Sequence, residues 1–428
     1  MDLILTVPLG LRLIVLAVVG AAVGGQLNRG IYRLAWHARS ISPWSSVPRG
    51  VASRSWFDRI PIVGWLTLRR EAPVQGRGFW IRPLLIELGT AAAFALLYWL
   101  ETERFVLWPI GVSVDMTLRA AAHQQFLAHA VMLSLMIVAT FIDFDEQTIP
   151  DGITVTGTIV AFGLIVALPW STLPTMYHPA WHASSVHHLV FTSTTYSPAW
   201  HDGLGGPMSW PPSLDQYFGL TVTLASVWIW CFAIMHKTWT LRHGPTRAVR
   251  YLVASIVRRG RWILPVVIGV ALSVLVVGVW RLDGSRWQAL ASSVIGMAFG
   301  GGLIWLVRIV AGEALQVEAM GFGDVTLMAM IGAFLGWQPA LLVFFLAPFT
   351  AIAIALAQWA LTGDRHIAFG PYLCLAAVLI LLGWRVAWYT WAMPLFALGW
   401  FVPGVVGCCL VMMGGLLWFW RIVRDAVF

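Results

Sequence analysis

Long apolar runs alternate with short polar segments along most of the 428-residue chain. A run of about twenty apolar residues crosses a bilayer as a helix, because lipid offers backbone polar groups no hydrogen-bond partner. The pattern therefore predicts about eleven crossings, of which the one at 325–337 is short. The runs lie near residues 7–28, 83–100, 124–142, 152–169, 218–236, 263–281, 290–311, 325–337, 339–361, 369–389 and 394–420.

Composition supports this interpretation. Apolar residues make up 59% of the chain and charged residues 11%, and the mean hydropathy is +0.79. A soluble domain cannot bury that much apolar surface, so we expect an all-α polytopic membrane protein, a helix bundle with a cytosolic N-terminal insertion. The first run is too long, and too poorly followed by a cleavage site, to be a removed signal peptide, and we expect a retained helix.

The distribution of Lys and Arg predicts orientation. Residues 29–82 hold ten arginines and 237–261 hold six arginines and one lysine, whereas the long loop 170–217 has neither. The positive-inside rule then puts the first two segments and the C-terminus in the cytosol, and the loop and the N-terminus outside. The formal net charge of +8 belongs to this bias, so nucleic-acid binding is not expected. The expected organisation is a first transmembrane helix (1–28), a cytosolic domain (29–82) and a transmembrane domain (83–428).

One cluster of acids interrupts the apolar pattern. In "FIDFDEQTIPD" (141–151), Asp143, Asp145, Glu146 and Asp151 follow a long uncharged run. Asp145 and Glu146 are best interpreted as solvated loop residues. Asp143 instead ends an apolar helix at the depth of the headgroups, where an ionisable group is costly and is a functional candidate by default.

A second acid is predicted at the same membrane face. In "GFGDVTLMAMIGAFLGW" (321–337), Asp324 stands before an apolar helix as a candidate N-cap, preceded by Gly321 and Gly323. Glycines allow close approach of another chain. Two aspartates from different helices at one depth can form an aspartic-protease pair, in which one carboxylate is the base toward water and the other stays protonated as the acid.

Several stretches resemble the signatures of the prepilin peptidases, the bacterial type IV leader peptidases of the Gly-x-Gly-Asp aspartyl class. "IDFDEQTIPD" is similar to their first signature, and the glycine stretch at 321–337 is similar to their second. The other similar stretches are "AFGPYL" (368–373), "GGQLNRGIYR" (24–33), "FDRIPIVGWLTLRR" (57–70) and "IRPLLIEL" with Arg82 and Glu87.

The resemblance implies that Asp143 and Asp324 are catalytic, with Gly321, Gly323 and Asp151 in support. Asp151 would open the following helix, with N-capping one way for it to do so. The implied activity is removal of the short basic leader of type IV prepilins or pseudopilins at the cytosolic face of the bacterial inner membrane. Some members of the family also methylate the new N-terminus with S-adenosylmethionine, and this activity stays open here.

The chain departs from the family at several places. Many members hold zinc with two Cys-x-x-Cys pairs, and the four corresponding positions here are Val47, Gly50, Ala72 and Gln75, so zinc is not expected. The family's lysine after the catalytic aspartate is Thr326. The four cysteines, Cys231, Cys374, Cys408 and Cys409, fall in predicted helices as buried small apolar residues.

Two further interpretations remain. Loop 170–217 contains His178, His182, His187, His188 and His201 beside Asp202, a pattern that includes a metal-ligand spacing but is better explained as an interfacial loop. For the whole protein, the alternatives are a peptidase of the same class with another membrane-anchored substrate, or a proton or solute transporter that uses the buried acids.

Overall fold

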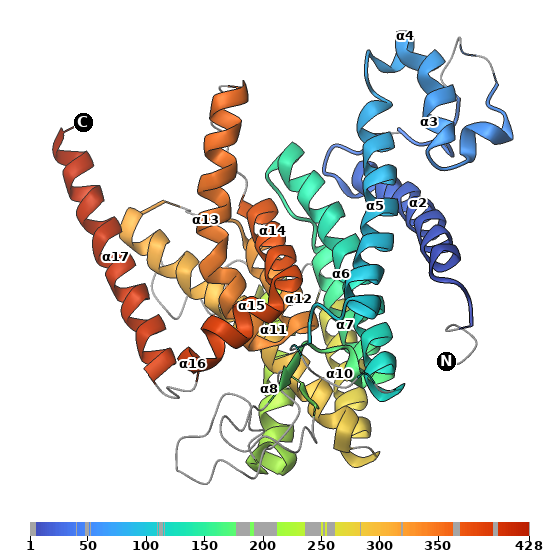
Figure 1. Cartoon of the computed structure of the whole chain (residues 1–428). Coiled ribbons are helices and arrows are strands. Elements are labelled where there is room, and N and C mark those ends of the chain that lie inside the picture. The colour runs from blue at the N-terminus through green and yellow to red at the C-terminus, as the bar shows by residue number, and fades with distance from the viewer. Residues whose placement is uncertain are drawn as a thin grey trace.

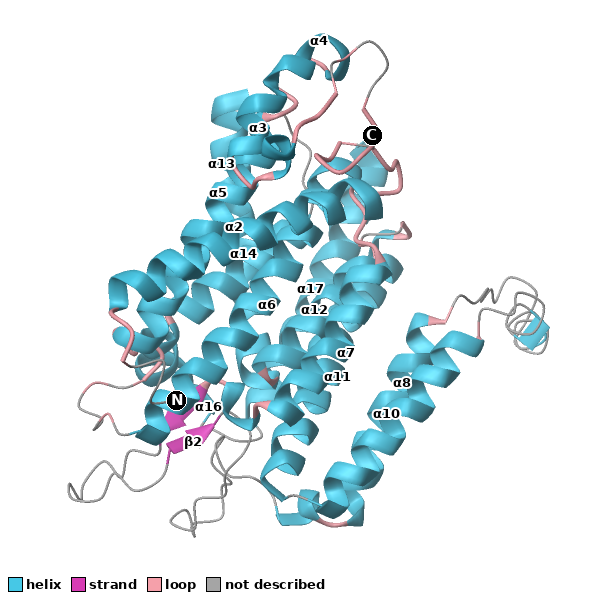
Figure 2. Cartoon of the chain, turned by 90° about the vertical axis from the view of Figure 1, so that its right-hand side faces the viewer, coloured by secondary structure: helices cyan, strands magenta, loops and turns pink. Residues whose placement is uncertain are grey.

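The computed structural model of the protein is an almost entirely helical bundle (Figure 1). In both overall views the small helices α3 (Val63–Leu68) and α4 (Ala72–Gln75) lie at the same end of the bundle as the C-terminus, and the strands lie at the other end (Figures 1 and 2). The structure describes residues 6–39, 41–47, 51, 53–108, 110, 114, 116–176, 189–191, 212–235, 250, 253–254, 262–282, 284–317, 320–362, 369–396 and 401–427.

Each predicted apolar run contains one main helix. These helices are α2 (Leu9–Leu34), α5 (Ile81–Tyr98), α6 (Met116–Glu146), α7 (Asp151–Ala167), α8 (Tyr217–Ile234), α10 (Ile263–Leu282), α11 (Gly284–Leu315), α12 (Phe322–Leu335), α13 (Trp337–Thr362), α14 (Phe369–Leu382) and α17 (Phe401–Val427). Short helical pieces extend two of them: η3 (Trp99–Glu103) continues α5, and α15 (Trp384–Val386), η6 (Ala387–Ala392) and α16 (Met393–Phe396) follow α14.

The chain is therefore a polytopic all-α membrane protein. Among the described residues, eight helices are long and apolar enough to cross a bilayer, and a ninth crossing results if α14 and the helical residues after it, bent by 75°, are one span. The remaining two apolar helices, α7 and α12, are shorter. The count of eleven crossings stays a prediction.

The predicted outer loop contributes the strands. Strand β1 (Pro174–Met176) pairs antiparallel with β2 (Leu189–Phe191), with Pro174 opposite Phe191. Other parts of the loop lie outside the described residues, as does most of segment 237–261. The residues of the candidate metal pattern all lie outside the described residues: His178, His182, His187, His188, His201 and Asp202.

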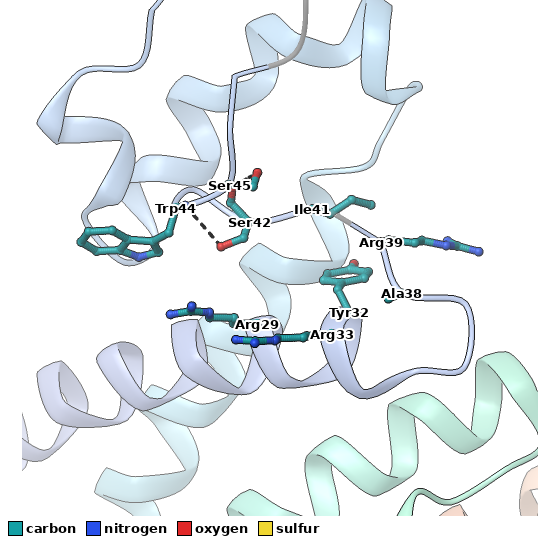
Figure 3. Close-up of a pocket in the computed structure, with 9 residues that line it drawn as sticks. All are labelled: Arg29, Tyr32, Arg33, Ala38, Arg39, Ile41, Ser42, Trp44 and Ser45. Carbon is teal, nitrogen blue, oxygen red and sulfur yellow. Dashed lines mark hydrogen bonds between the residues drawn. The ribbon is translucent and has the colours of Figure 1, made fainter. Parts of the chain in front are cut away.

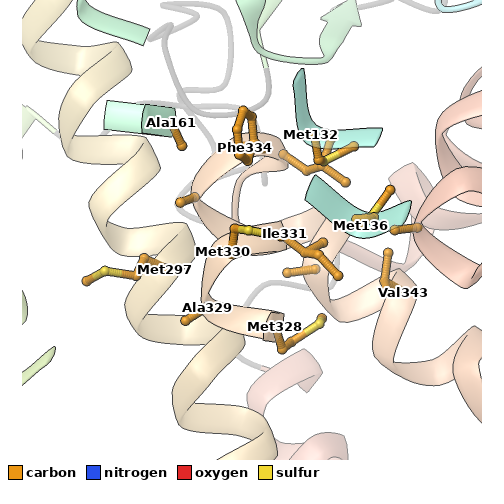
Figure 4. Packing of buried hydrophobic residues seen from close by; sticks show 14 of the residues in the cluster. Met132, Met136, Ala161, Met297, Met328, Ala329, Met330, Ile331, Phe334 and Val343 are labelled. Carbon is orange, nitrogen blue, oxygen red and sulfur yellow. The ribbon is translucent and has the colours of Figure 1, made fainter. Parts of the chain in front are cut away.

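Helix α12 lies at the centre of the bundle. Every residue from Asp324 to Leu335 is buried, because α11, α7, α13, α14 and α6 surround the helix. Its side chains meet those of the surrounding helices in one apolar cluster rich in methionine, whose flexible thioether fills irregular gaps. Figure 4 labels, in this cluster, Met328, Ala329, Met330, Ile331 and Phe334 of α12 with Met132, Met136, Ala161, Met297 and Val343 of its neighbours.

Two facing glycines allow α11 and α12 to pack closely. A Cβ added at Gly296 would collide with the carbonyl oxygen of Gly332, and a Cβ added at Gly332 would collide with that of Gly296. Beside this crossing, the hydroxyl of Ser293 donates a hydrogen bond of 2.5 Å to the carbonyl of Ala333. Small residues at such crossings bring helix backbones together in membranes.

The outer helices are less covered. Helices α8 and α10 pack on each other at one edge of the bundle (Figure 2). Helix α17 packs along α11, and no residue in the most apolar stretch of α17 is buried. The expectation of four buried cysteines is therefore wrong for two of them: Cys231 and Cys374 are buried, but Cys408 and Cys409 are exposed on α17.

We expect Gly296→Ala to destabilise the protein by about 1–3 kcal/mol, because the added methyl overpacks the crossing of α11 and α12. Gly302 lies in the same helix with open space where its Cβ would be, so Gly302→Ala is the matched control and should leave stability unchanged or slightly raised. Thermal unfolding of the detergent-solubilised variants measures both effects. Equal midpoints for the two variants would contradict the tight crossing.

Candidate active site

Asp143 lies in the last turn of α6, and its side chain is buried. The helix ends at Glu146. The next residue, Gln147, has a positive φ of 52° that turns the chain away, and its N–H donates to the carbonyl of Asp143. The carboxyl oxygen Oδ2 of Asp143 accepts a hydrogen bond of 3.0 Å from the backbone N–H of Gly370 in the first turn of α14. A Cβ at position 370 would lie 2.7 Å from that oxygen, so this contact requires glycine.

Asp324 lies in the first turn of α12 and is also buried. The expectation that it is the N-cap is wrong: the N-cap is Gly321, in an extended conformation, and the helix begins at Phe322. Gly323 lies where the loop between α6 and α7 meets the start of α12. A Cβ there would lie 2.9 Å from the Cβ of Ile149 and close to its backbone, so glycine lets the loop between α6 and α7 approach α12.

The structure brings the two buried acids together. The carboxyl of Asp143 contacts Gly370 in the first turn of α14, and Asp324 follows Gly323 in the first turn of α12. Buried Ile149 packs between the two helix starts, against Gly323 on one side and Gly370 on the other. Three signatures far apart in the sequence, at 142–151, 321–337 and 368–373, thus meet at one place in the fold.

Asp151 lies on α7, and Thr326 lies on α12, which packs against α7. Asp151 is the first residue of α7 and is exposed, but the N-cap is Pro150, whose carbonyl accepts from the N–H groups of Ile153 and Thr154. Asp151 therefore opens the helix without capping it. Thr326 is buried, and its hydroxyl accepts a 2.9 Å hydrogen bond from Thr154 of α7, so it ties α12 to α7.

Comparisons with known proteins match two parts of the chain. Residues 260–356 match the type IV leader peptidase family, and residues 18–100 match the bacterial peptidase A24 N-terminal domain. These two stretches are similar to the type IV leader peptidases. Asp324 lies inside the first match, and Asp143 lies outside both.

Curated proteins that are similar to parts of the chain are named prepilin leader peptidase/N-methyltransferase. That of Myxococcus xanthus is 29% identical over 154 residues, 36% of this chain and 40% of the relative. The protein of Pseudomonas aeruginosa is 28% identical over 170 residues, which are 38% of this chain and 57% of the relative. The protein of Stutzerimonas stutzeri is 32% identical over 111 residues, which are 25% of this chain and 37% of the relative. The chain thus matches less than two thirds of the length of each of these relatives. No solved structure matches it.

In the region of the family's N-terminal domain, three motifs converge on Glu87 of α5. Its carboxylate accepts hydrogen bonds from the indole Nε1 of Trp65 (2.7 Å), the side-chain amide of Asn28 (3.3 Å) and the backbone N–H of Ile62. Gly24 of α2 lies against the backbone of the same glutamate. The sequence resemblance pointed to Glu87 by its spacing, but its partners come from segments whose contacts the sequence does not reveal.

Asp145 and Glu146 join the N-terminal region to the site. The expectation that they are solvated loop residues is wrong in part, because both still belong to α6 and both have partners. The guanidinium of Arg82 donates to Asp145 at 2.7 Å and to the carbonyl of Phe141 at 3.1 Å. Glu146 accepts from the backbone N–H groups of residues 36 and 37, just after α2. Sequence reasoning missed that the backbone N–H groups just after α2 need hydrogen-bond acceptors, which the carboxylate of Glu146 supplies.

Buried ion pairs hold the short helices of the N-terminal region. Arg54 donates to both carboxylate oxygens of Glu71, at 2.7 and 2.8 Å, and both side chains are almost fully buried. Arg70, whose side chain is partly exposed, donates in the same two-pronged way to buried Asp58. Burial opposes ionisation of Asp58, but hydrogen bonds from Arg70 and its other neighbours outweigh it and lower the pKa to about 2.

These residues do not fit the family's zinc site. Val47, Ala72 and Gln75 offer no metal-binding side chain, and Gly50 lies outside the described residues. No group of three or more His, Cys, Asp or Glu within the described ranges could hold a metal ion. Instead, the Arg54–Glu71 pair links the two segments that would carry the ligands, since Arg54 also donates to the carbonyls of Ser42 and Ser45.

We expect Arg54→Met to destabilise the N-terminal region by about 3–5 kcal/mol, because it leaves the carboxylate of Glu71 buried without a cation. The double variant Arg54→Met/Glu71→Leu should recover most of this loss, since apolar side chains can replace a buried pair. The rate of limited proteolysis within residues 41–75 measures the effect. A metal chelator should not alter this rate in the unmodified protein. Equal rates for single and double variants, or sensitivity to the chelator, would contradict this role of the ion pair.

Proposed function

We propose that the protein is a membrane-embedded aspartic endopeptidase that removes the short basic leader of type IV prepilins or pseudopilins. The observation that carries the proposal is the pair of buried carboxyls of Asp143 and Asp324, which lie at the ends of two helices that meet around Ile149. Buried acids are expensive in a membrane protein and are functional candidates. The family relationship supports the choice of substrate, because the similar proteins are named as prepilin leader peptidases.

The chemistry follows from two carboxyls in one site. The ionised carboxyl takes a proton from water, and the water oxygen attacks the scissile carbonyl carbon while the protonated partner donates to the carbonyl oxygen. Collapse of this intermediate breaks the C–N bond, and a proton passes to the leaving amine. The N–H of Gly370 holds the carboxyl of Asp143 in place, so Gly370 is a positioning residue.

The site faces the cytosol in the proposed topology. The arginines of 29–82 keep that segment inside, which puts the N-terminus outside and the C-terminus inside the bacterial inner membrane. Helix α6 ends and α12 begins at this cytosolic face, where a basic leader would also remain. We retain the proposed division into a first transmembrane helix (1–28), a cytosolic domain (29–82) and a transmembrane peptidase domain (83–428).

N-methylation of the new pilin N-terminus is the second candidate activity. It is supported by the match of residues 18–100 to the bacterial N-terminal domain and by the names of the relatives. S-adenosylmethionine would supply the methyl group, and the amine of the cleaved pilin would accept it. The N-terminal region differs from the family's zinc-binding members, so this activity is proposed for the region without zinc.

We expect Asp143→Asn and Asp324→Asn each to lower cleavage of a model prepilin by at least about 10³-fold. Asparagine keeps the shape of each side chain, but it can neither take a proton from water nor act as the acid. Cleavage is measured on the protein reconstituted in liposomes, with insertion verified by membrane fractionation.

The matched control for this experiment is Asp145→Asn. It removes a neighbouring carboxylate of the same helix that pairs with Arg82 outside the buried site. We expect it to retain most of the activity. Normal cleavage by either catalytic variant would exclude the proposed pair, and failure of the unmodified protein to cut prepilins would favour another substrate or a transporter.

For methylation, we expect methyl transfer from labelled S-adenosylmethionine to a pilin that has already been cut. The Asp143→Asn variant should still catalyse this transfer, because methylation would not use the buried carboxyls. Mass spectrometry of the pilin N-terminus gives the readout. An unmodified N-terminus after incubation with the unmodified protein would restrict the function to proteolysis.

A further inference from the structure

A cavity of about 270 Å³ lies where α2 ends and the N-terminal polar segment begins (Figure 3). Arg29 and Arg33 come from the last turns of α2, and Ser42, Trp44 and Ser45 come from the segment that folds back over them. In Figure 3 the two arginine side chains lie next to each other below Ser42 and Trp44, whereas Arg39 points to the opposite side.

The charge of this cavity is not neutralised by its own lining. None of the lining residues is acidic. Among the described residues, neither Arg29 nor Arg33 forms an ion pair with a carboxylate. By contrast, Arg54 and Arg70 of the same region each form an ion pair with a buried carboxylate. A cavity with two adjacent unpaired guanidinium groups favours an anion.

The arginines continue a stripe of α2 that faces lipid. Leu11, Val15 and Val18 are 52%, 52% and 63% exposed. Steps of three or four residues along the same face lead from Val18 through exposed positions 22 and 26 to Arg29 and Arg33. Helix α2 packs against α5 and α6 with its opposite face. A lipid chain lying along the apolar part of this stripe would therefore lead to the two arginines.

The depth of the arginines agrees with a headgroup position. About twenty helical residues cross the hydrocarbon core of a bilayer. Counted from Leu9, where α2 begins, such a crossing ends near Arg29, and Arg33 follows one turn later. The two guanidinium groups thus lie at the border between hydrocarbon and headgroups, where lipid phosphates are found.

The polar lining matches a phosphate group. Guanidinium groups bind phosphate through paired N–H donors. The hydroxyl oxygen of Ser42 accepts from the N–H of Trp44 at 3.2 Å, which leaves the hydroxyl hydrogen available to a ligand oxygen. The cavity is smaller than the roughly 300–1,000 Å³ of pockets for drug-sized ligands, so it suits a small headgroup.

We propose that this cavity binds the phosphate headgroup of an anionic phospholipid. The basic leader of a prepilin would be repelled by the same arginines, so the cavity is not the leader site. A bound lipid would fix the chain that follows α2, and this chain is joined to the end of α6 through Glu146. Lipid binding does not depend on the proposed peptidase activity and can be tested separately from it.

The test uses the full chain purified in detergent, with bound lipid measured by native mass spectrometry. Phosphatidylglycerol should bind at least about tenfold more tightly than phosphatidylcholine, a difference of about 1.4 kcal/mol. Arg29→Gln/Arg33→Gln should abolish this preference. The control Arg69→Gln/Arg77→Gln removes the same charge from exposed residues outside the cavity and should keep it.

Further measurements distinguish the possible anions. Arg29→Lys/Arg33→Lys keeps the charge but loses the paired donors, so an intermediate preference is expected. Inorganic phosphate at the same concentration should not displace the lipid, and displacement would indicate a site for free phosphate. Displacement by an acidic peptide would indicate a substrate site. A full preference for phosphatidylglycerol in the Gln double variant would exclude this cavity as the lipid site.

Discussion

The candidate site depends on how closely helices can approach α12. Gly332 lets α11 pack against its last turn, and Gly323 lets the loop before α7 pack against its start. Gly370 completes the arrangement, because its N–H can reach Asp143 only without a side chain in between. The glycines are therefore as important to the site as the acids.

Polar contacts at one end of the bundle connect this site to the N-terminal region. Arg82 reaches Asp145, Glu146 holds the chain after α2, and Glu87 gathers three motifs of the N-terminal region. Most of these contacts join segments far apart in the sequence. Hydrogen bonds and an ion pair thus tie the N-terminal region to the end of α6, which carries Asp143. This connection gives a physical reason for one chain to combine the two regions.

Ion pairs hold the N-terminal region together at the place where the family that the sequence resembles has a zinc site. In members with zinc, the ion would cross-link two loops of this small region. Here a buried arginine–glutamate pair joins the corresponding segments, and Asp58 is held ionised by Arg70 and hydroxyl and backbone donors. Buried pairs of this kind are sensitive to loss of one partner, because the remaining charge stays in a poorly solvated place.

The sequence by itself determined the membrane class, the apolar helices and the two candidate acids. Lipid forces each apolar run to satisfy its own backbone, so local composition is enough to predict helices. The sequence did not predict the N-caps of α7 and α12, which are Pro150 and Gly321. It also did not predict that Cys408 and Cys409 are exposed. Tertiary structure decided those features, the partners of Glu87 and the place of the two adjacent arginines in the cavity, because all of them depend on which distant segments pack together.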